Sequence, residues 1–355
     1  MTRLAYLAGA AALAAALGLA GNAFADTFVV AGDNVDCVAG GAADATTIQG
    51  GIGAASAGDT VAVCPGTYSE DLEIFGLDGL TLIATDRADN TTTVIQGVAD
   101  SGGATFPFAV PNIDLQSHGV TITGFTIRSP AAVVGEYASG LIIDGTDNKI
   151  YNNKFEVSCG TPGSVAIQTW ALANGSQGLG DISGLTIALN TFRSLFPNAS
   201  GCLGYEGVFI NPQSAVNEED PVVVSGNNFG GRLYRAVGVV RSYTDVGFNT
   251  IRTGLFTQIT DDFGTVPIGI KVFDGSNSVI ANNSIVGGFF FFLPRFNTGI
   301  WLTADTAGNI VKNNVVQFSA TNDCLDESTD TGTAGTANIW TGNTGFNADP
   351  ADICN

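Results

Sequence analysis

The sequence has 355 residues, among them 47 glycines, 33 acidic side chains and 13 basic ones, and 13% of its residues are charged. The formal net charge of −20 opposes binding to nucleic acid or to an anionic membrane surface. It also opposes a polyanionic substrate unless cations mediate the contact. Polar character that comes mainly from Asn, Thr, Ser and Gly is typical of a chain with many turns, and it disfavours a helical enzyme.

The first residues predict an export signal. Arg3 supplies a positive start, residues 4–19 form an almost continuous apolar run, and Ala23-Phe24-Ala25 matches the small-x-small pattern of a cleavage site. The apolar run is short for a membrane-spanning helix. We therefore expect a signal peptide over residues 1–25, no membrane span in the mature chain, and a protein secreted to the periplasm or the medium.

The cysteines predict disulfide bonds. Six cysteines in an exported chain indicate three disulfides, and several pairings are possible. A metal site is the weaker interpretation, because the sequence has no C-x-x-C motif and a single histidine, His118. The simplest pairing is sequential: Cys37–Cys64, Cys159–Cys202 and Cys324–Cys354.

A specific pattern lies near the start of the mature chain. It comprises Thr47-Ile48-Gln49, then Gly58-Asp59-Thr60-Val61, then Pro65-Gly66-Thr67-Tyr68. The pattern resembles the opening of pectate-lyase-like right-handed parallel β-helices, in which a short helix plugs the N-terminal end before the first coil. The resemblance implies an all-β solenoid with a short N-terminal capping helix within 47–56. That superfamily includes lyases, hydrolases, esterases, epimerases and non-enzymes, so the resemblance implies a fold and no single activity.

From residue 150 onward one motif recurs, in which an asparagine has an apolar residue three positions before it and another two positions after it. The intervals between these asparagines range from 22 to 37 residues. A constant motif at a variable interval is typical of a solenoid of roughly ten coils from which loops of different length emerge. Asparagine tolerates the left-handed backbone of a bend, and stacked amides hydrogen-bond along a column, so we expect structural roles. The asparagines are Asn153, Asn190, Asn227, Asn249, Asn283, Asn313 and Asn343.

These later repeats also resemble the short β-helix repeats of NosD-type periplasmic proteins. That resemblance implies copper, but one histidine and one methionine make a copper site improbable. A nucleotide cofactor is disfavoured too, because no P-loop or dinucleotide-binding glycine motif is present. We expect one domain over residues 26–355, in which residues 321–355 form a C-terminal cap.

A second element precedes most of the asparagine motifs. It is a glycine followed by a short strand, at Gly140, Gly207, Gly269 and Gly299 and, as a looser member, at Gly238. Alternation predicts that residues one and three after the glycine point inward while residues two and four point outward. A glycoside hydrolase needs paired carboxylates, and this column offers one acid, Asp144, so that class is disfavoured.

A lyase needs a base, and Arg241 and Lys271 lie on coils predicted to be adjacent, so these two side chains are the catalytic candidates. Asp261 and Asp262 are candidate ligands for Ca²⁺, the one metal cofactor that the sequence makes plausible. In the alternative interpretation, these charges only solvate one face of the solenoid.

Aromatic side chains at the outward positions favour a binding face. Phe209, Phe273 and Trp301 offer flat rings that stack on sugars, and Asp144 offers a hydrogen-bond acceptor. In the alternative interpretation, the rings pack beneath a long loop. We therefore expect a secreted protein that interacts with a polysaccharide or cell-surface glycan, with polysaccharide-lyase-like activity as one version. The rival class is a non-catalytic structural or surface-interaction protein.

Overall fold

The computed structural model describes residues 25–32, 37, 43–86, 90–98, 109–129, 137–158, 164–169, 180–195, 205–211, 216–231, 233–252, 267–287 and 297–355. Several predictions lie outside these residues. They are the signal peptide predicted over residues 1–25, of which 1–24 are outside, the disulfide Cys159–Cys202, and the calcium ligands Asp261 and Asp262.

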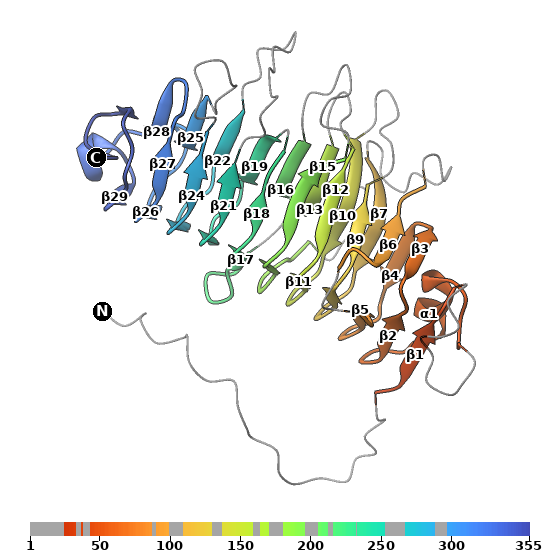
Figure 1. The fold of residues 1–355 in the computed structure, drawn as a ribbon. Coiled ribbons are helices and arrows are strands. Elements are labelled where there is room, and N and C mark those ends of the chain that lie inside the picture. Colours follow the sequence, from red (N-terminus) through yellow and green to blue (C-terminus); the bar gives the residue numbers. More distant parts are fainter. Residues whose placement is uncertain are drawn as a thin grey trace, which may run out of the picture.

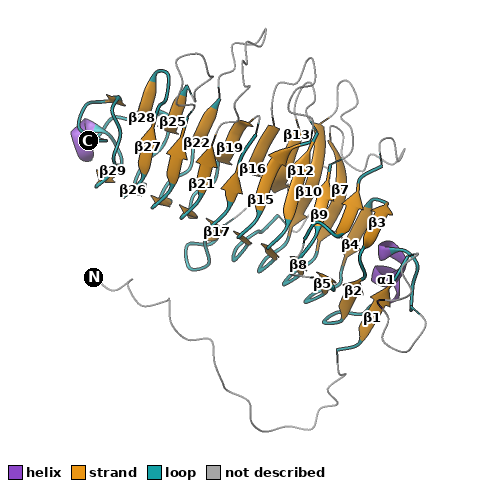
Figure 2. Cartoon of the chain, in the orientation of Figure 1, coloured by secondary structure: helices purple, strands orange, loops and turns teal. Residues whose placement is uncertain are grey.

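The chain forms a right-handed parallel β-helix, as predicted. Successive strands fall into three sheets, every neighbouring pair within a sheet is parallel, and the sheets run the length of the solenoid (Figures 1 and 2). Parallel stacking buries one face of each strand and leaves open edges at the two ends of the solenoid. Among the described residues, no helix combines the length and apolar character that a bilayer crossing needs.

The three sheets are named A, B and C here. Sheet A holds β1 (Thr27–Val30), β2 (Thr60–Val63), β5 (Thr81–Ala84), β8 (Thr121–Thr123), β11 (Lys149–Tyr151), β14 (Thr186–Ala188), β17 (Val222–Ser225), β20 (Thr244–Gly247), β23 (Val279–Ala281), β26 (Ile310–Lys312) and β29 (Ile339–Thr341). Sheet B holds β3 (Gly66–Ser69), β6 (Thr93–Gln96), β9 (Thr126–Arg128), β12 (Lys154–Val157), β15 (Thr191–Ser194), β18 (Asn228–Phe229), β21 (Thr250–Arg252), β24 (Ser284–Val286) and β27 (Val315–Gln317). Sheet C holds β4 (Leu72–Phe75), β7 (Ala109–Gln116), β10 (Tyr137–Asp144), β13 (Ser164–Thr169), β16 (Tyr205–Ile210), β19 (Leu233–Val239), β22 (Ile268–Val272), β25 (Thr298–Leu302), β28 (Asn322–Asp326) and β30 (Ala348–Asp349).

Helix α1 (Ile48–Ala54) lies at the N-terminal end of the solenoid (Figure 1). The carboxylate of Glu70 accepts hydrogen bonds from the first two helical N–H groups, at 2.8 and 3.0 Å. A Cβ at Gly51 would meet Val30 Cγ2 at 2.6 Å, so glycine is what lets the helix lie against β1. Packing therefore outweighs the low helix propensity of this segment.

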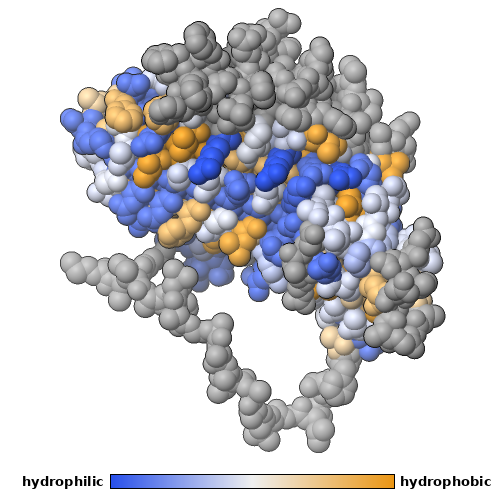
Figure 3. All heavy atoms as spheres, in the orientation of Figure 1, coloured by the Kyte–Doolittle hydropathy of each residue, from blue (hydrophilic) through white to orange (hydrophobic). Residues whose placement is uncertain are grey.

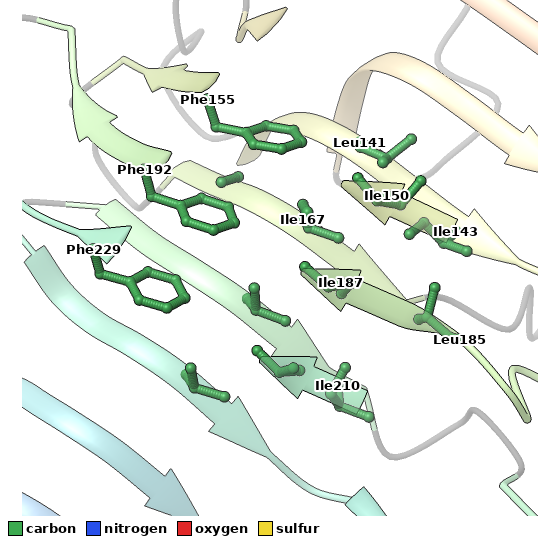
Figure 4. Packing of buried hydrophobic residues seen from close by; sticks show 14 of the residues in the cluster. Leu141, Ile143, Ile150, Phe155, Ile167, Leu185, Ile187, Phe192, Ile210 and Phe229 are labelled. Carbon is green, nitrogen blue, oxygen red and sulfur yellow. The ribbon is translucent and has the colours of Figure 1, made fainter. Parts of the chain in front are cut away.

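The core is a set of stacked apolar rows, one residue per coil. Phe155, Phe192 and Phe229 are register partners in sheet B, and their rings stack with centroids 5.1 and 4.5 Å apart (Figure 4). Aromatic pairs of this kind contribute about 0.5–1.5 kcal/mol beyond their buried area. Rows of isoleucine, leucine and valine from the other two sheets fill the rest of the interior (Figure 4).

The predicted asparagine column is present and buried. Each side-chain amide donates to a main-chain carbonyl. The Oδ1 of Asn153 accepts from Phe125 N, and from Asn190 onward each Oδ1 accepts from the preceding asparagine of the column. Asn227, for example, donates to Ile187 O at 2.9 Å and accepts from Asn190 N at 2.9 Å. One member was predicted wrongly. Asn314 belongs to the column, whereas Asn313 is the left-handed residue before it, with φ of 55°. The flanking apolar residues are therefore Val311 and Val316, both fully buried.

The two ends of the solenoid are fastened covalently. The structure contains the predicted disulfides Cys37–Cys64, near the first coil, and Cys324–Cys354, at the last. The chain beyond β28 is also held by the buried carboxylate of Asp326, which accepts from Trp340 Nε1 at 2.7 Å and from Asn338 Nδ2 at 3.1 Å.

The column predicts a large cost for breaking one amide in its middle. Replacing Asn227 by Ala leaves Asn190 N and Ile187 O without their buried partner. Each orphaned group costs about 1–3 kcal/mol, so we expect a loss of about 3 kcal/mol in the free energy of unfolding. Denaturant titration of the disulfide-bonded protein measures this. Asn228→Ala, at the adjacent exposed position, is the control, and an equal loss in both variants would contradict the assignment.

Candidate functional site

The outward positions of sheet C form straight columns because the strands pair without slipping over most of their length. One column contains Phe209, Gly238, Lys271 and Trp301 as successive register partners on β16, β19, β22 and β25. The flanking residues of these strands are buried, whereas Phe209, Lys271 and Trp301 are partly exposed. At these positions the strand register and the burial agree with the side-chain directions that the repeat predicts.

Lys271 lies between two aromatic rings. Its Nζ is 3.5 Å from the centroid of the Trp301 ring and 4.5 Å from that of Phe273. Burial lowers the pKa of Lys271, and the neighbouring positive charge of Arg235 lowers it further, while Glu327 raises it. The ammonium is therefore easier to deprotonate than that of a solvated lysine.

Arg235 completes the cluster from β19. Its guanidinium lies 4.5 Å from the ring centroid of Phe273 and 5.3 Å from that of Phe209, and the two rings meet edge to face at 6.3 Å. A 2.5 Å ion pair with Glu206 compensates its charge. The residues Phe209, Arg235, Lys271, Phe273 and Trp301 are called the sheet C cluster below.

Gly238 makes the cluster possible. A Cβ at this position would lie 2.7 Å from Arg235 Nε and Glu206 Oε1 and 2.8 Å from a ring atom of Phe209. Sequence reasoning aligned Gly238 with the repeat glycines, but the register places Ala236 opposite Gly207 and Gly269. Arg235 and Glu206 were missed because strict alternation places them on the inward face, with fully buried residues such as Val237 and Val208.

Arg241, the other lyase candidate, is not the register partner of Lys271 on the adjacent strand. Lys271 pairs with Gly238, so Arg241 follows that position by three residues, beyond the end of β19. Its Nε is buried without a hydrogen-bond partner among the described residues. The cation that acts on the pKa of Lys271 is instead Arg235.

Asp144 lies on the same sheet, nearer the N-terminal end. It is the register partner of Gln116 on β7, the adjacent strand, which also carries Asp114. The Oδ1 of Asp144 accepts a hydrogen bond from Gly180 N at 2.7 Å. Both aspartates are almost fully buried. The structure therefore places Asp144 with a second acid, two strands away from the first aromatic of the sheet C cluster.

Asp114 is a feature that the repeat pattern did not reveal, since β7 precedes the regular coils. Burial raises its pKa to about 7; a hydrogen bond from Gln116 Nε2 at 3.2 Å opposes the shift, and the charges of Glu73 and Asp144 add to it. The alternation of residues 112–116, with buried Ile113 and Leu115, is the signal that could have found it. A carboxyl with this pKa exchanges a proton near neutral pH.

Two further donors lie in the outward column of sheet C. Gln168 Nε2 and Trp301 Nε1 are buried and have no hydrogen-bond partner within the described part of the chain. No group of three His, Cys, Asp or Glu side chains that could hold a metal ion occurs among the described residues. The sheet C face thus offers aromatic rings, two cations and N–H donors, which suits an oxygen-rich ligand with flat apolar faces.

Comparisons with known proteins support the fold. No protein-family model matches the sequence, and no curated protein matches it. Among solved structures, an alginate lyase from Paenibacillus sp. str. FPU-7 is similar, with a TM-score of 0.54, 14% identity, and coverage of 91% of this chain and 99% of that one. At this identity the likeness concerns the parallel β-helix fold alone.

Two pectin methylesterases are similar at lower scores. The Aspergillus niger enzyme has a TM-score of 0.43 and 12% identity, covering 92% of this chain and 87% of that one. The carrot enzyme has a TM-score of 0.39 and 13% identity, covering 94% of this chain and 90% of that one.

The raised pKa of Asp114 predicts a pH-dependent stability. Because the folded state holds this proton more tightly than the unfolded chain, the contribution of Asp114 to stability is fully present below about pH 4 and is lost as the pH rises through about 7. The shift from 3.8 to about 7 corresponds to about 4 kcal/mol at most. Denaturant unfolding between pH 4 and pH 7 should show that the free energy of unfolding falls less with pH in Asp114→Asn than in the wild type. An unchanged pH profile in the variant would contradict the assigned pKa.

Proposed function

We propose that this protein is an exported carbohydrate-interacting β-helix that holds a polysaccharide on the outer face of sheet C. The observation that carries the proposal is the sheet C cluster, in which two cations lie over three partly exposed aromatic rings on neighbouring strands. Sugar rings present apolar faces that stack on aromatic side chains, while their hydroxyl and carboxylate oxygens accept hydrogen bonds from cations.

Rigidity supports the same proposal. The cluster stands on strands whose inward residues are fully buried, including Val237, Ile270 and Ile300. Its side chains are thus held in one geometry before a ligand arrives, which lowers the entropic cost of binding. The disulfides Cys37–Cys64 and Cys324–Cys354 are consistent with an oxidising compartment outside the cytoplasm, where polysaccharides occur.

Removing one ring should weaken binding. We expect Trp301→Ala to lose about tenfold or more in affinity for the preferred polymer, since a buried aromatic contact is worth about 1.4 kcal/mol or more. Affinity gels or calorimetry with a polysaccharide panel, including alginate and pectin, measure this. Phe346→Ala is the matched control, because Phe346 is 75% exposed in the C-terminal segment. Unchanged binding by Trp301→Ala would refute the sheet C site.

A second candidate function is eliminative cleavage of a uronic-acid polymer, and the lowered pKa of Lys271 favours it. Neutral Lys271 would remove the proton from the ring carbon next to the carboxylate. The electron pair forms a carbon–carbon double bond as the glycosidic bond breaks, and the leaving oxygen takes a proton from solvent. Arg235, the described cation beside Lys271, could stabilise the charge building on the carboxylate.

The lyase candidate has its own test. Cleavage would produce ultraviolet absorbance from the unsaturated product, at a rate that rises with pH as Lys271 loses its proton. We expect Lys271→Met, which keeps the length of the side chain, to reduce this rate by about 100-fold or more, as loss of a general base does. Binding without absorbance change would leave a non-catalytic carbohydrate-binding protein. No binding and no cleavage across the panel would favour the structural class.

A further inference from the structure

Sheet B carries a row of basic side chains on its outward face. Arg128, Glu156 and Arg193 are successive register partners on β9, β12 and β15. Arg252 continues the row on β21, because it follows Ile251 as Arg193 follows Phe192, and these two residues align through Phe229 on β18. Lys154 stands beside the row, two residues before Glu156. The residues Arg128, Lys154, Arg193 and Arg252 are called the basic stripe below.

The spacing within the stripe is regular. The arginines stand on alternate strands, and strands of a sheet are about 4.8 Å apart, so the arginine backbones recur at about 10 Å along the solenoid axis. Between Arg193 and Arg252 lies Gly230, where an added Cβ would meet no described atom within 4 Å. Glycine thus leaves an open position between two exposed guanidinium groups.

The stripe has little opposing charge. Glu156 is the one acidic residue at the outward positions of the described sheet B strands, and it is engaged by Arg128 at 2.6 Å and by Lys154. Burial alone would raise the pKa of Glu156, but the hydrogen bonds and charges of Lys154 and Arg128 hold it below its ordinary value. The carboxylate stays ionised and is shared by Arg128 and Lys154. In the described part of the chain, Arg193 and Arg252 have no ion pair.

This arrangement is unusual for a chain of net charge −20. Figure 3 shows the sheet B face, on which strongly hydrophilic residues recur in a row along the solenoid. The second outward column, beside the arginines, presents hydroxyl and amide groups from Thr191, Asn228, Thr250 and Ser284. Charged and neutral polar groups therefore run in parallel along one flat surface.

We propose that the basic stripe binds a linear acidic polysaccharide that lies along the solenoid axis. Regularly spaced arginines match a polymer whose carboxylates recur at the fixed interval of its sugar units, and the neighbouring hydroxyl and amide groups match its hydroxyls. A nucleic acid fits less well, because its dense charge would meet the strongly acidic remainder of the protein. The stripe lies on a different sheet from the sheet C cluster, so the inference stands without the proposed function.

The test is a charge reversal on the exposed part of the stripe. We expect Arg193→Glu/Arg252→Glu to weaken binding of polygalacturonate by about tenfold or more at low salt, because two attractions become repulsions. Wild-type binding should also fall steeply as salt is raised, since the Debye length is about 10 Å at 0.1 M, similar to the spacing of the arginines. Circular dichroism confirms that the variant keeps its β-helix.

The control is Lys149→Glu/Lys312→Glu, which makes the same charge change on sheet A. An equal loss in this control would show that overall charge alone decides binding, and would overturn the proposal. Equal wild-type affinity for fully methyl-esterified polygalacturonate, or tighter binding of a DNA oligonucleotide, would also overturn it. Trp301→Ala separates the two surfaces: binding that depends on Trp301 but not on the arginine pair supports sheet C and refutes the stripe.

Discussion

The buried amide column at the bend between sheets A and B is the constraint on which the rest of the structure depends. Each bend would bury main-chain groups that the strands cannot pair, and each asparagine satisfies them from the neighbouring coil. Because every amide bonds to the coils before and after it, the coils are held in one register. Surface residues therefore fall into straight columns, and the sheet C cluster and the basic stripe are two products of that register.

The sequence predicted the parts of the molecule that repeat. Alternation after the repeat glycines correctly placed Phe209, Lys271 and Trp301 on one face, and the asparagine motif identified the bends. Sequence reasoning failed where strand register across loops of variable length decides which residues are neighbours. Gly238 was aligned with Gly269, although its register partner is Lys271, and Arg235 was missed. Asp114 was missed for another reason, since it lies before the regular coils, and its raised pKa comes from burial that no local pattern displays.

Net charge alone does not decide what a given face of the protein can bind. A value of −20 argues against acidic ligands only if the charge is spread evenly. Here the sheets differ: Asp114, Asp144 and Glu73 gather on the N-terminal half of sheet C, whereas sheet B is basic. At ionic strengths where the Debye length is about 8–10 Å, a ligand responds to the sheet it touches more than to the whole protein.

The placement of the disulfides has a consequence for where the molecule comes apart. In a solenoid each coil contacts only its neighbours, so thermal opening starts at the terminal coils, which have one neighbour instead of two. Cys37–Cys64 and Cys324–Cys354 close these coils, while the middle of the stack relies on its amide column and phenylalanine rings. Reduction of the two disulfides should therefore let the coils at both ends unfold first. Unfolding then proceeds inward, and the outer coils of sheets B and C are lost before the central ones.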